Sequence, residues 1–373
     1  MNGPAADFGV LLPDRAAYSR LRPVVDTNEY PRLVAVETTN HCNAKCVFCP
    51  NNALARDKGP MADDVFEKII EDCREFPLEA IEPFIQGDPF SDPQILPRLE
   101  HIRRRLPKTK LRLYTNGYGM APKKIDQMLD LGIDHLFVSV NTLNPEKYRS
   151  VMGIPLKRTL DNLAYLTDSS RKHRVAKKIT FRMTRLGDTT LAEQDDFVRY
   201  CKERGVKHFI VGLFNYKGDV NSSLPVPRYG CEHVNRLDIL ASGRITLCCM
   251  DQDGSYGWGD VKEHSVLELY RHAAARKYRD FHASGRRREI EPCGTCNLFW
   301  PLTRGLTPLE AVRTGIDYCA YIARYRPIGK RPPAAAVGGD SLVQLRARHQ
   351  DMGARAKARH AEAPAEDAES SAE

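Results

Sequence analysis

The stretch Cys42-Asn-Ala-Lys-Cys46-Val-Phe-Cys49 decides the organisation of this 373-residue chain. It directly follows residues 32–37, a short apolar run that predicts a buried strand. A loop this short brings three thiolates together but does not easily supply a fourth, which indicates a four-iron cluster with one iron left open for a ligand. A zinc site completed by His41 or by a remote residue is the alternative.

Length and composition restrict the class of protein. The length favours a large domain plus a smaller one, and 42% apolar with 28% charged residues is typical of a soluble globular protein. No stretch approaches the length of a transmembrane helix and the N-terminus lacks the pattern of a signal peptide, so we expect a cytoplasmic protein without a membrane partner. In a reducing compartment, eleven cysteines favour metal ligands or catalytic thiols over disulfides.

The formal charge of +8 is modest for this length. Basic residues fall in short runs at 103–105, 171–174 and 286–288, which are typical of solvated faces. Aromatic residues are not interleaved with them as on single-strand nucleic-acid surfaces, so we expect no nucleic-acid partner.

Short β-branched or aromatic runs alternate with amphipathic stretches from residue 32 onward. This alternation predicts parallel βαβ units and an α/β fold, a partial (β/α)6 TIM-like barrel. Asn144 before a proline, and Thr190 three residues before Glu193, are helix-start signals. The expected strands are 32–37, 80–86, 110–115, 134–140, 178–184 and 207–213, and the expected helices are 64–76, 93–106, 122–131, 144–151, 157–168 and 190–204.

Polar residues follow several of the predicted strands. Gly87 and Asp88 come after the second strand, Asn116 after the third, and Ser139 and Asn141 at the end of the fourth. Each alone is also typical of a turn. Because chemistry in such barrels lies at the carboxyl ends of the strands, three such ends in register with the cysteine loop after the first strand predict a site.

The pattern changes after about residue 225, where residues 222–227 are typical of a linker. Residues 237–240 and 244–247 predict a β-hairpin, and Ser265 with Glu268 predicts a capping box that opens a helix of about twenty residues. We divide the chain into an arm at 1–30, a barrel at 31–225, a smaller cysteine-rich domain at 226–325 and a disordered or partly helical tail at 326–373. The smaller domain's cysteines, which suit either zinc or a second cluster, are Cys231, Cys248, Cys249, Cys293 and Cys296.

Over residues 31–225 the chain resembles the radical S-adenosylmethionine (radical SAM) enzymes, on the basis of Cys42-x3-Cys46-x2-Cys49 with an aromatic Phe48 before the third cysteine. The resemblance implies a [4Fe-4S] cluster whose open iron binds SAM, and cleavage of SAM to a 5′-deoxyadenosyl radical after one-electron reduction by a donor such as flavodoxin or ferredoxin. It also implies cofactor-binding roles for Phe48, Gly87, Asp88, Asn116, Ser139 and Asn141, although Asp88 stands where the family's Gly-Glu-Pro segment has glutamate.

The second half resembles the SPASM extension of that family, through Cys231-x11-Gly243-x4-Cys248. The cysteines expected after Cys293-x2-Cys296 are missing apart from Cys319, which is similar to the shorter "twitch" form of aminocyclitol dehydrogenases and sugar epimerases. This resemblance implies one auxiliary [4Fe-4S] cluster held by Cys231, Cys248, Cys293 and Cys296.

We therefore expect a radical SAM oxidoreductase or epimerase acting on a polar small molecule, a sugar or aminocyclitol. In an epimerase Cys249, or with a weaker claim Cys319, could donate a hydrogen atom, while Cys73 and Cys201 are expected to be buried core residues. Asn215, Tyr216 and Lys217 are candidates to face the cavity. The alternatives are a maturase of ribosomal peptides and a non-catalytic zinc-binding scaffold.

Overall fold

The computed structural model describes residues 29–222, 224–298, 300–302, 308–325 and 345. The expected arm at 1–30 and tail at 326–373 therefore lie almost wholly outside the described residues. Leu345, within the tail, is helical and buried among apolar side chains around the three-cysteine loop.

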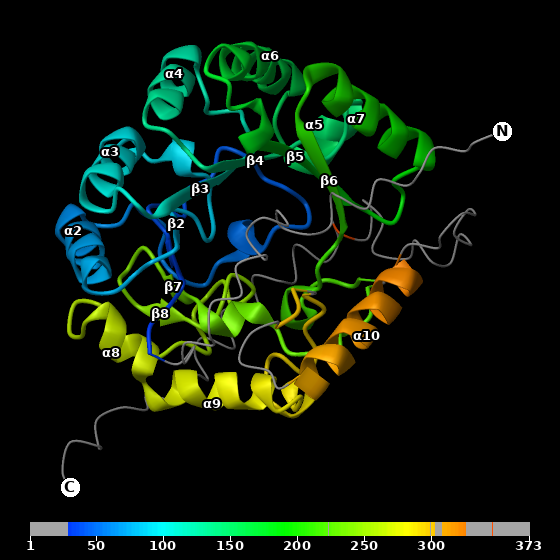
Figure 1. The fold of residues 1–373 in the computed structure, drawn as a ribbon. Coiled ribbons are helices and arrows are strands. Elements are labelled where there is room, and N and C mark those ends of the chain that lie inside the picture. The colour runs from blue at the N-terminus through cyan, green and yellow to red at the C-terminus, as the bar shows by residue number, and fades with distance from the viewer. Residues whose placement is uncertain (1–28, 223, 299, 303–307, 326–344, 346–373) are drawn as a thin grey trace, which may run out of the picture.

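Six parallel strands form the arc of an open barrel (Figure 1), which confirms the expected fold class. The second strand is shorter than expected, because the backbone turns tightly at Glu82, whose carbonyl accepts from the Phe84 amide at 2.7 Å. The strands are β1 (Leu33–Val36), β2 (Ala80–Glu82), β3 (Lys110–Thr115), β4 (His135–Ser139), β5 (Ile179–Arg185) and β6 (Lys207–Gly212).

The helices that follow the strands lie on the outside of the arc (Figure 1). Two start signals are confirmed: the Asn144 side chain accepts from the Lys147 amide, and Thr190 and Glu193 form a capping box. The helices are α2 (Asp63–Asp72), α3 (Ile95–Arg105), α4 (Pro122–Asp130), α5 (Pro145–Met152), α6 (Leu156–Lys172) and α7 (Leu191–Arg204). Short 3-10 helices are η2 (Pro50–Ala53), η3 (Cys73–Glu75), η4 (Pro89–Ser91), η5 (Ala176–Lys178), η6 (Tyr216–Gly218), η7 (Glu232–Asn235) and η8 (Arg287–Glu289).

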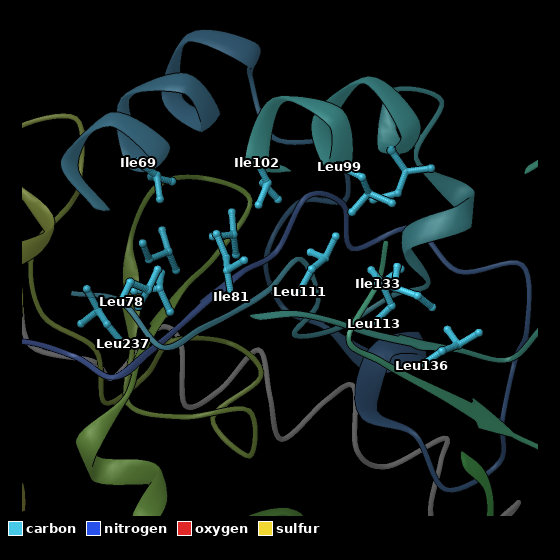
Figure 2. Packing of buried hydrophobic residues seen from close by; sticks show 14 of the residues in the cluster. Ile69, Leu78, Ile81, Leu99, Ile102, Leu111, Leu113, Ile133, Leu136 and Leu237 are labelled. Atoms are coloured by element: carbon cyan, nitrogen blue, oxygen red, sulfur yellow. The ribbon is translucent and has the colours of Figure 1, made fainter. Parts of the chain in front are cut away.

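The main core lies between the strands and the outer helices. Figure 2 shows Ile69 of α2 and Leu99 and Ile102 of α3 pointing toward the strand residues Ile81 and Leu111, all within one apolar cluster. Cys73 and Cys201 are fully buried in the same cluster, as expected.

The other face of the strands lines the interior of the barrel. Buried and half-buried residues alternate along β3, β4 and β5, because successive side chains of a strand point to opposite faces. The half-buried set points inward and retains partial solvent access. Its members include Tyr114, Phe137, Ser139, Thr180 and Arg182.

The C-terminal hairpin extends the barrel sheet. β7 (Leu237–Ile239) pairs in parallel with β1, Val34 opposite Leu237, and β8 (Ile245–Thr246) pairs antiparallel with β7. The sequence predicted the hairpin but not its partner. Because an open barrel leaves the backbone groups of its edge strand unpaired, β7 satisfies the edge that β1 would otherwise expose.

The prediction of a single helix after Ser265 is wrong. The capping box of Ser265 and Glu268 is present, but His272 adopts φ −55° and ψ 147°, and its Nδ1 accepts from the Ala274 amide, so a second helix begins. The helices are α8 (Val266–Arg271), α9 (Ala273–Ala283) and, farther on, α10 (Pro308–Tyr325). Within the described ranges, none of the helices combines the length and apolar character of a membrane span.

Glu37, at the end of β1, ties the surrounding segments together. Its buried carboxylate accepts two hydrogen bonds of 2.6 Å from Arg56, one of 2.9 Å from the Ala241 amide in the hairpin turn and one of 3.2 Å from the Gln86 amide. This side chain therefore joins the cysteine-loop segment, the end of the second strand and the hairpin.

Replacing Glu37 by alanine is expected to lower the free energy of unfolding by about 3–5 kcal/mol, because it leaves the Arg56 guanidinium buried without its partner. Chemical denaturation monitored by circular dichroism measures the change. The matched control is Glu71→Ala, which removes an exposed ion pair with Arg105 and should have little effect. An equal loss for both variants would contradict the role given to Glu37.

Candidate active site

The three-cysteine loop is fixed to the barrel by α5. The amides of Lys45 and Val47 donate to the carbonyls of Met152 and Val151 at 2.9 and 3.0 Å. Half-buried Cys42, Cys46 and Cys49 pack with buried Phe48 against one apolar cluster. The loop is thus held by backbone hydrogen bonds while its thiols face a largely apolar pocket.

Burial controls the chemistry of these thiols. It raises the pKa of Cys42 to about 12, with the Asp88 carboxylate adding to the rise. Burial also raises the pKa of Cys46 well above its ordinary value, and the neighbouring Cys49 and Cys42 raise it further. Because a thiolate is the form that binds metal, a bound cation would relieve the mutual repulsion that these three groups exert when ionised.

Gly87 lets the end of the second strand touch the loop backbone. Its φ is +80°, and a Cβ at this position would lie 2.6 Å from the His41 carbonyl oxygen and 2.8 Å from that of Thr39. The next amide, of Asp88, donates to the same His41 carbonyl at 2.9 Å. Only glycine satisfies both the left-handed conformation and the close approach.

The Asp88 carboxylate accepts hydrogen bonds from other groups of the protein. It accepts hydrogen bonds from the Asn116 amide at 2.8 Å, the Thr115 hydroxyl at 2.9 Å and the Phe90 amide at 3.0 Å. Burial raises the pKa of Asp88, although these donors oppose the rise. The shorter aspartate therefore joins the ends of the second and third strands and positions Asn116.

Asn116 and Asn141 border the loop from two strand ends. The Asn116 Nδ2 donates to Asn43 Oδ1 at 2.7 Å and lies 3.8 Å from Cys42 Sγ. The Asn141 Nδ2 lies 2.9 Å from Met152 Sδ, which is in turn 3.5 Å from Cys46 Sγ. Ser139, half-buried at the end of β4, completes the border on the barrel side.

A Gly87→Ala variant tests the close approach. We expect its free energy of unfolding to fall by more than the ~1–2 kcal/mol that a left-handed alanine costs. We also expect it to lose iron from the three-cysteine loop, because the two backbone segments must move apart. The control is Gly132→Ala, where φ is +72° but nothing lies within 4 Å of the added Cβ. Iron content and urea denaturation of both variants would show the difference, and equal behaviour would mean that backbone conformation alone matters.

The cysteines of the second set lie close together. Cys231, Cys248, Cys249 and Cys296 share a small apolar cluster with Met250. Burial is the main cause that raises the pKa of Cys248, followed by the charges of Cys249, Cys296 and Cys293. The four cysteines expected to hold an auxiliary cluster are therefore electrostatic neighbours, with Cys249 beside them.

Arg287 is the residue that sequence analysis missed. The run 286–288 was expected to be a solvated face, but the Arg287 side chain is among the largest that are fully buried. Its Nη2 donates to the carbonyls of Cys296 at 2.8 Å and Leu298 at 3.1 Å, and its charge lowers the pKa of Cys231 against the larger effect of burial. A basic run gives no signal that its middle member turns inward.

The cysteines of each set suit an iron–sulfur cluster. In the part of the chain that the structure describes, no three His, Cys, Asp or Glu side chains are grouped so as to hold a single metal ion. Thiolates around a cubane cluster each bind a different iron, so they surround the cluster instead of meeting at one point. Buried thiols next to a buried guanidinium fit such a group.

Several contacts join the two cysteine sets. Arg56, shortly after the first set, donates from Nε to the Gln252 carbonyl at 2.7 Å, and the Ala55 amide donates to Asp253 Oδ1 at 2.8 Å. The Gln86 Nε2 donates to the Cys249 carbonyl at 3.2 Å. Both sets therefore belong to one rigidly connected region.

Tyr216 lies between the two sets. It packs against the apolar cluster of the first set and against that of the second. Burial raises its pKa well above the ordinary value, as do the thiols of Cys49, Cys249 and Cys46, while Arg182 opposes the rise.

The backbone at Tyr216 is unusual. Tyr216 and Lys217 have φ values of +44° and +64°, and strained non-glycine residues often mark functional sites. The Lys217 Nζ pairs with Asp251 at 3.1 Å, and the Asn215 Nδ2 donates to the Thr295 carbonyl at 2.7 Å. Anchors in the second cysteine region thus hold Tyr216 in place.

The two cysteines considered as hydrogen donors differ in their surroundings. Cys249 Sγ lies 3.7 Å from His233 Nδ1, and burial raises its pKa to about 12, so the thiol keeps its proton. Cys319 is exposed on α10.

Comparison with known proteins identifies two domains. Residues 36–201 match the sequence model of the radical SAM superfamily, and residues 231–297 match that of the SPASM iron-sulfur cluster-binding domain. The chain therefore carries a radical SAM domain and a SPASM domain. The cofactors of these domains are a [4Fe-4S] cluster with SAM and, in SPASM, auxiliary iron–sulfur clusters.

Individual relatives are distant and differ in activity. A probable GTP 3′,8-cyclase of Methanococcus vannielii is 25% identical over 47% of this chain and 56% of its own length, so the match spans about half of that relative. The SAM-dependent 2-deoxy-scyllo-inosamine dehydrogenase of Niallia circulans is 19% identical over 71% of this chain and 92% of its own. The crystal structure of Streptococcus suis SuiB bound to the precursor peptide SuiA has the same fold, with TM-score 0.57 and 15% identity over 76% of this chain and 73% of SuiB.

Proposed function

We propose that this chain is a radical SAM oxidoreductase that removes hydrogen from a carbon–hydrogen bond of a polar small molecule. Residues 31–225 form the SAM-cleaving unit and residues 226–325 the auxiliary-cluster unit. Cys42, Cys46 and Cys49 hold the first [4Fe-4S] cluster. Cys231, Cys248, Cys293 and Cys296 hold the second.

The observation that carries the proposal is the position of Tyr216, which packs against both cysteine sets. A substrate lodged beside this tyrosine in the barrel opening is within reach of both clusters. One site can then serve for hydrogen removal and for the departure of an electron.

Each residue group has a distinct task. When bound, the two clusters and SAM supply the one-electron chemistry, which proteins position but do not themselves perform. Asn116, Ser139 and Asn141 bind SAM at the strand ends, with Phe48 as the apolar support of the loop. Gly87 brings the second strand against the loop, and Asp88 orients Asn116.

Arg287 favours the electron-transfer role of the second cysteine set. Its buried positive charge offsets the negative charge of four thiolates, and buried charge next to a cluster raises its reduction potential. After one hydrogen atom is removed, the substrate radical would have to lose a proton and one further electron, and a cluster at the second cysteine set would accept that electron.

A sugar or aminocyclitol is the substrate class that the dehydrogenase match supports best. The SuiB match keeps a peptide maturase as the alternative within the same family. The reductant is a one-electron donor of the flavodoxin or ferredoxin kind. A reducing cytoplasm suits a chain whose thiols must remain available as ligands.

Iron and sulfide content after anaerobic reconstitution tests the two-cluster assignment. We expect about eight irons in the wild type and about four in a Cys42/Cys46/Cys49 triple alanine variant, because each thiolate set holds four. The reciprocal variant replaces Cys231, Cys248, Cys293 and Cys296 by alanine and should also keep about four.

Zinc in the second set, or a colourless protein, would contradict the assignment. About four irons in the wild type that fall to almost none in the triple variant would also remove the proposed electron acceptor.

Epimerisation is a second candidate, favoured by the Cys249 thiol, which packs against the same apolar cluster as Tyr216. Under the oxidation proposal no thiol donates hydrogen, so the Cys249→Ala variant should cleave SAM within about twofold of the wild-type rate. For comparison, a rise of about 1.4 kcal/mol in the barrier would slow the reaction about tenfold. The assay follows 5′-deoxyadenosine and product in deuterated buffer, with exposed Cys319→Ala as control. Solvent deuterium in a product carbon of the wild type, lost only in Cys249→Ala, would instead identify an epimerase.

A further inference from the structure

Aromatic rings line one side of the barrel interior. Phe84 stacks on Tyr114 with ring centroids 5.3 Å apart, and Tyr114 stacks on Phe137 at 4.6 Å. All three side chains are half-buried, so they keep access to the space inside the barrel. These rings form a flat, rigid wall.

Arg182 stands above this wall. It occupies an inward position of β5, opposite Ser139 of β4 and Phe209 of β6. Its guanidinium carbon is 5.6 Å from the centre of the Tyr114 ring and 5.8 Å from that of Phe209. Contacts with two ring faces fix the guanidinium while its hydrogen-bond donors remain available.

Among the described groups around this wall, three arginines stand against two carboxylates. Glu82 pairs with Arg112 at 3.6 Å and with Arg236 at 3.1 Å, and Asp238 also pairs with Arg236. Among the described residues, no carboxylate pairs with Arg182. The surplus charge of the interior is therefore the Arg182 guanidinium.

The surplus charge lies next to the proposed reaction site. Arg182 and the thiols of Cys49 and Cys249 all act on the phenol of Tyr216. By contrast, Lys58 is the cation that acts on the Cys42 and Cys49 thiols. Arg182, which pairs across the sheet with Ser139 at the end of β4, thus lies within electrostatic reach of Tyr216.

We propose that Arg182 is a substrate-binding residue that holds an anionic group, a carboxylate or a phosphate, against the wall of Phe84, Tyr114 and Phe137. This inference rests on the proposed function and narrows its substrate to acidic small molecules. A planar guanidinium recognises either oxyanion through paired hydrogen bonds. A protonated amine at this position would be repelled, so an acidic sugar fits better than an aminocyclitol.

Matched probe pairs test the proposal on the reconstituted enzyme with SAM bound. Isothermal titration calorimetry compares glucuronate with glucose, and glucose 6-phosphate with glucose, so the two arms distinguish carboxylate from phosphate. We expect the anionic member of at least one pair to bind at least about tenfold more tightly than glucose, as for a hydrogen bond to a charged group, and to weaken with added salt.

Three variants accompany the probes. Arg182→Gln should abolish the preference for the anion, and Arg182→Lys should restore part of it, because lysine keeps the charge but not the planar fork. Arg204→Gln is the matched control: Arg204 also stacks on a tyrosine, Tyr200 at 3.6 Å, but lies at the end of α7. It should bind the probes as the wild type does.

Several outcomes would overturn the proposal. One is that no anionic probe binds better than glucose. Another is that Arg182→Gln weakens binding of SAM instead of the probes, which would assign the guanidinium to the SAM carboxylate. A third is an altered potential of the auxiliary cluster with unchanged probe binding. Iron content and SAM cleavage are measured separately, so an enzyme with both clusters that prefers neutral sugars refutes this inference alone.

Discussion

The parallel pairing of β1 with β7 is the interaction on which the site depends. The three-cysteine loop leaves the carboxyl end of β1, and the hairpin that begins with β7 carries Cys248 and Cys249 beyond its second strand. Pairing these two strands therefore sets the hairpin turn beside the carboxyl end of β1, and β8 then runs back along the sheet and brings Cys249 against Ala35 of β1. The free edge of an open barrel supplies the driving force, because its backbone groups need partners.

Buried polar side chains then fix the distance between the parts. Glu37 joins the cysteine-loop segment to the hairpin turn, and Asp88 joins the ends of the second and third strands. Each carboxylate accepts several hydrogen bonds at once, and such networks specify one arrangement because any other leaves a buried charge without partners. The geometry of the loop therefore depends on residues that need not touch the cofactor.

Two arginines inside the molecule, Arg287 and Arg182, have different surroundings. Arg287 is fully enclosed and gives its donors to carbonyls around the second cysteine set. Arg182 is held by aromatic rings and keeps its donors available. Two residues of the same type thus take different roles because one has backbone partners and the other faces the open interior.

The sequence by itself determined the fold class, the positions of all six barrel strands and the loop of Cys42, Cys46 and Cys49, since strand periodicity and cysteine spacing are local properties. It also indicated the hairpin and the capping of α5 and α7. Only the tertiary structure decided that β7 extends the barrel, that Arg287 turns inward within a basic run, that Tyr216 packs against both cysteine sets and that Arg182 lies over two aromatic rings. These features join residues distant in sequence, and no local pattern records which strand edge, carbonyl or ring a side chain will meet after folding.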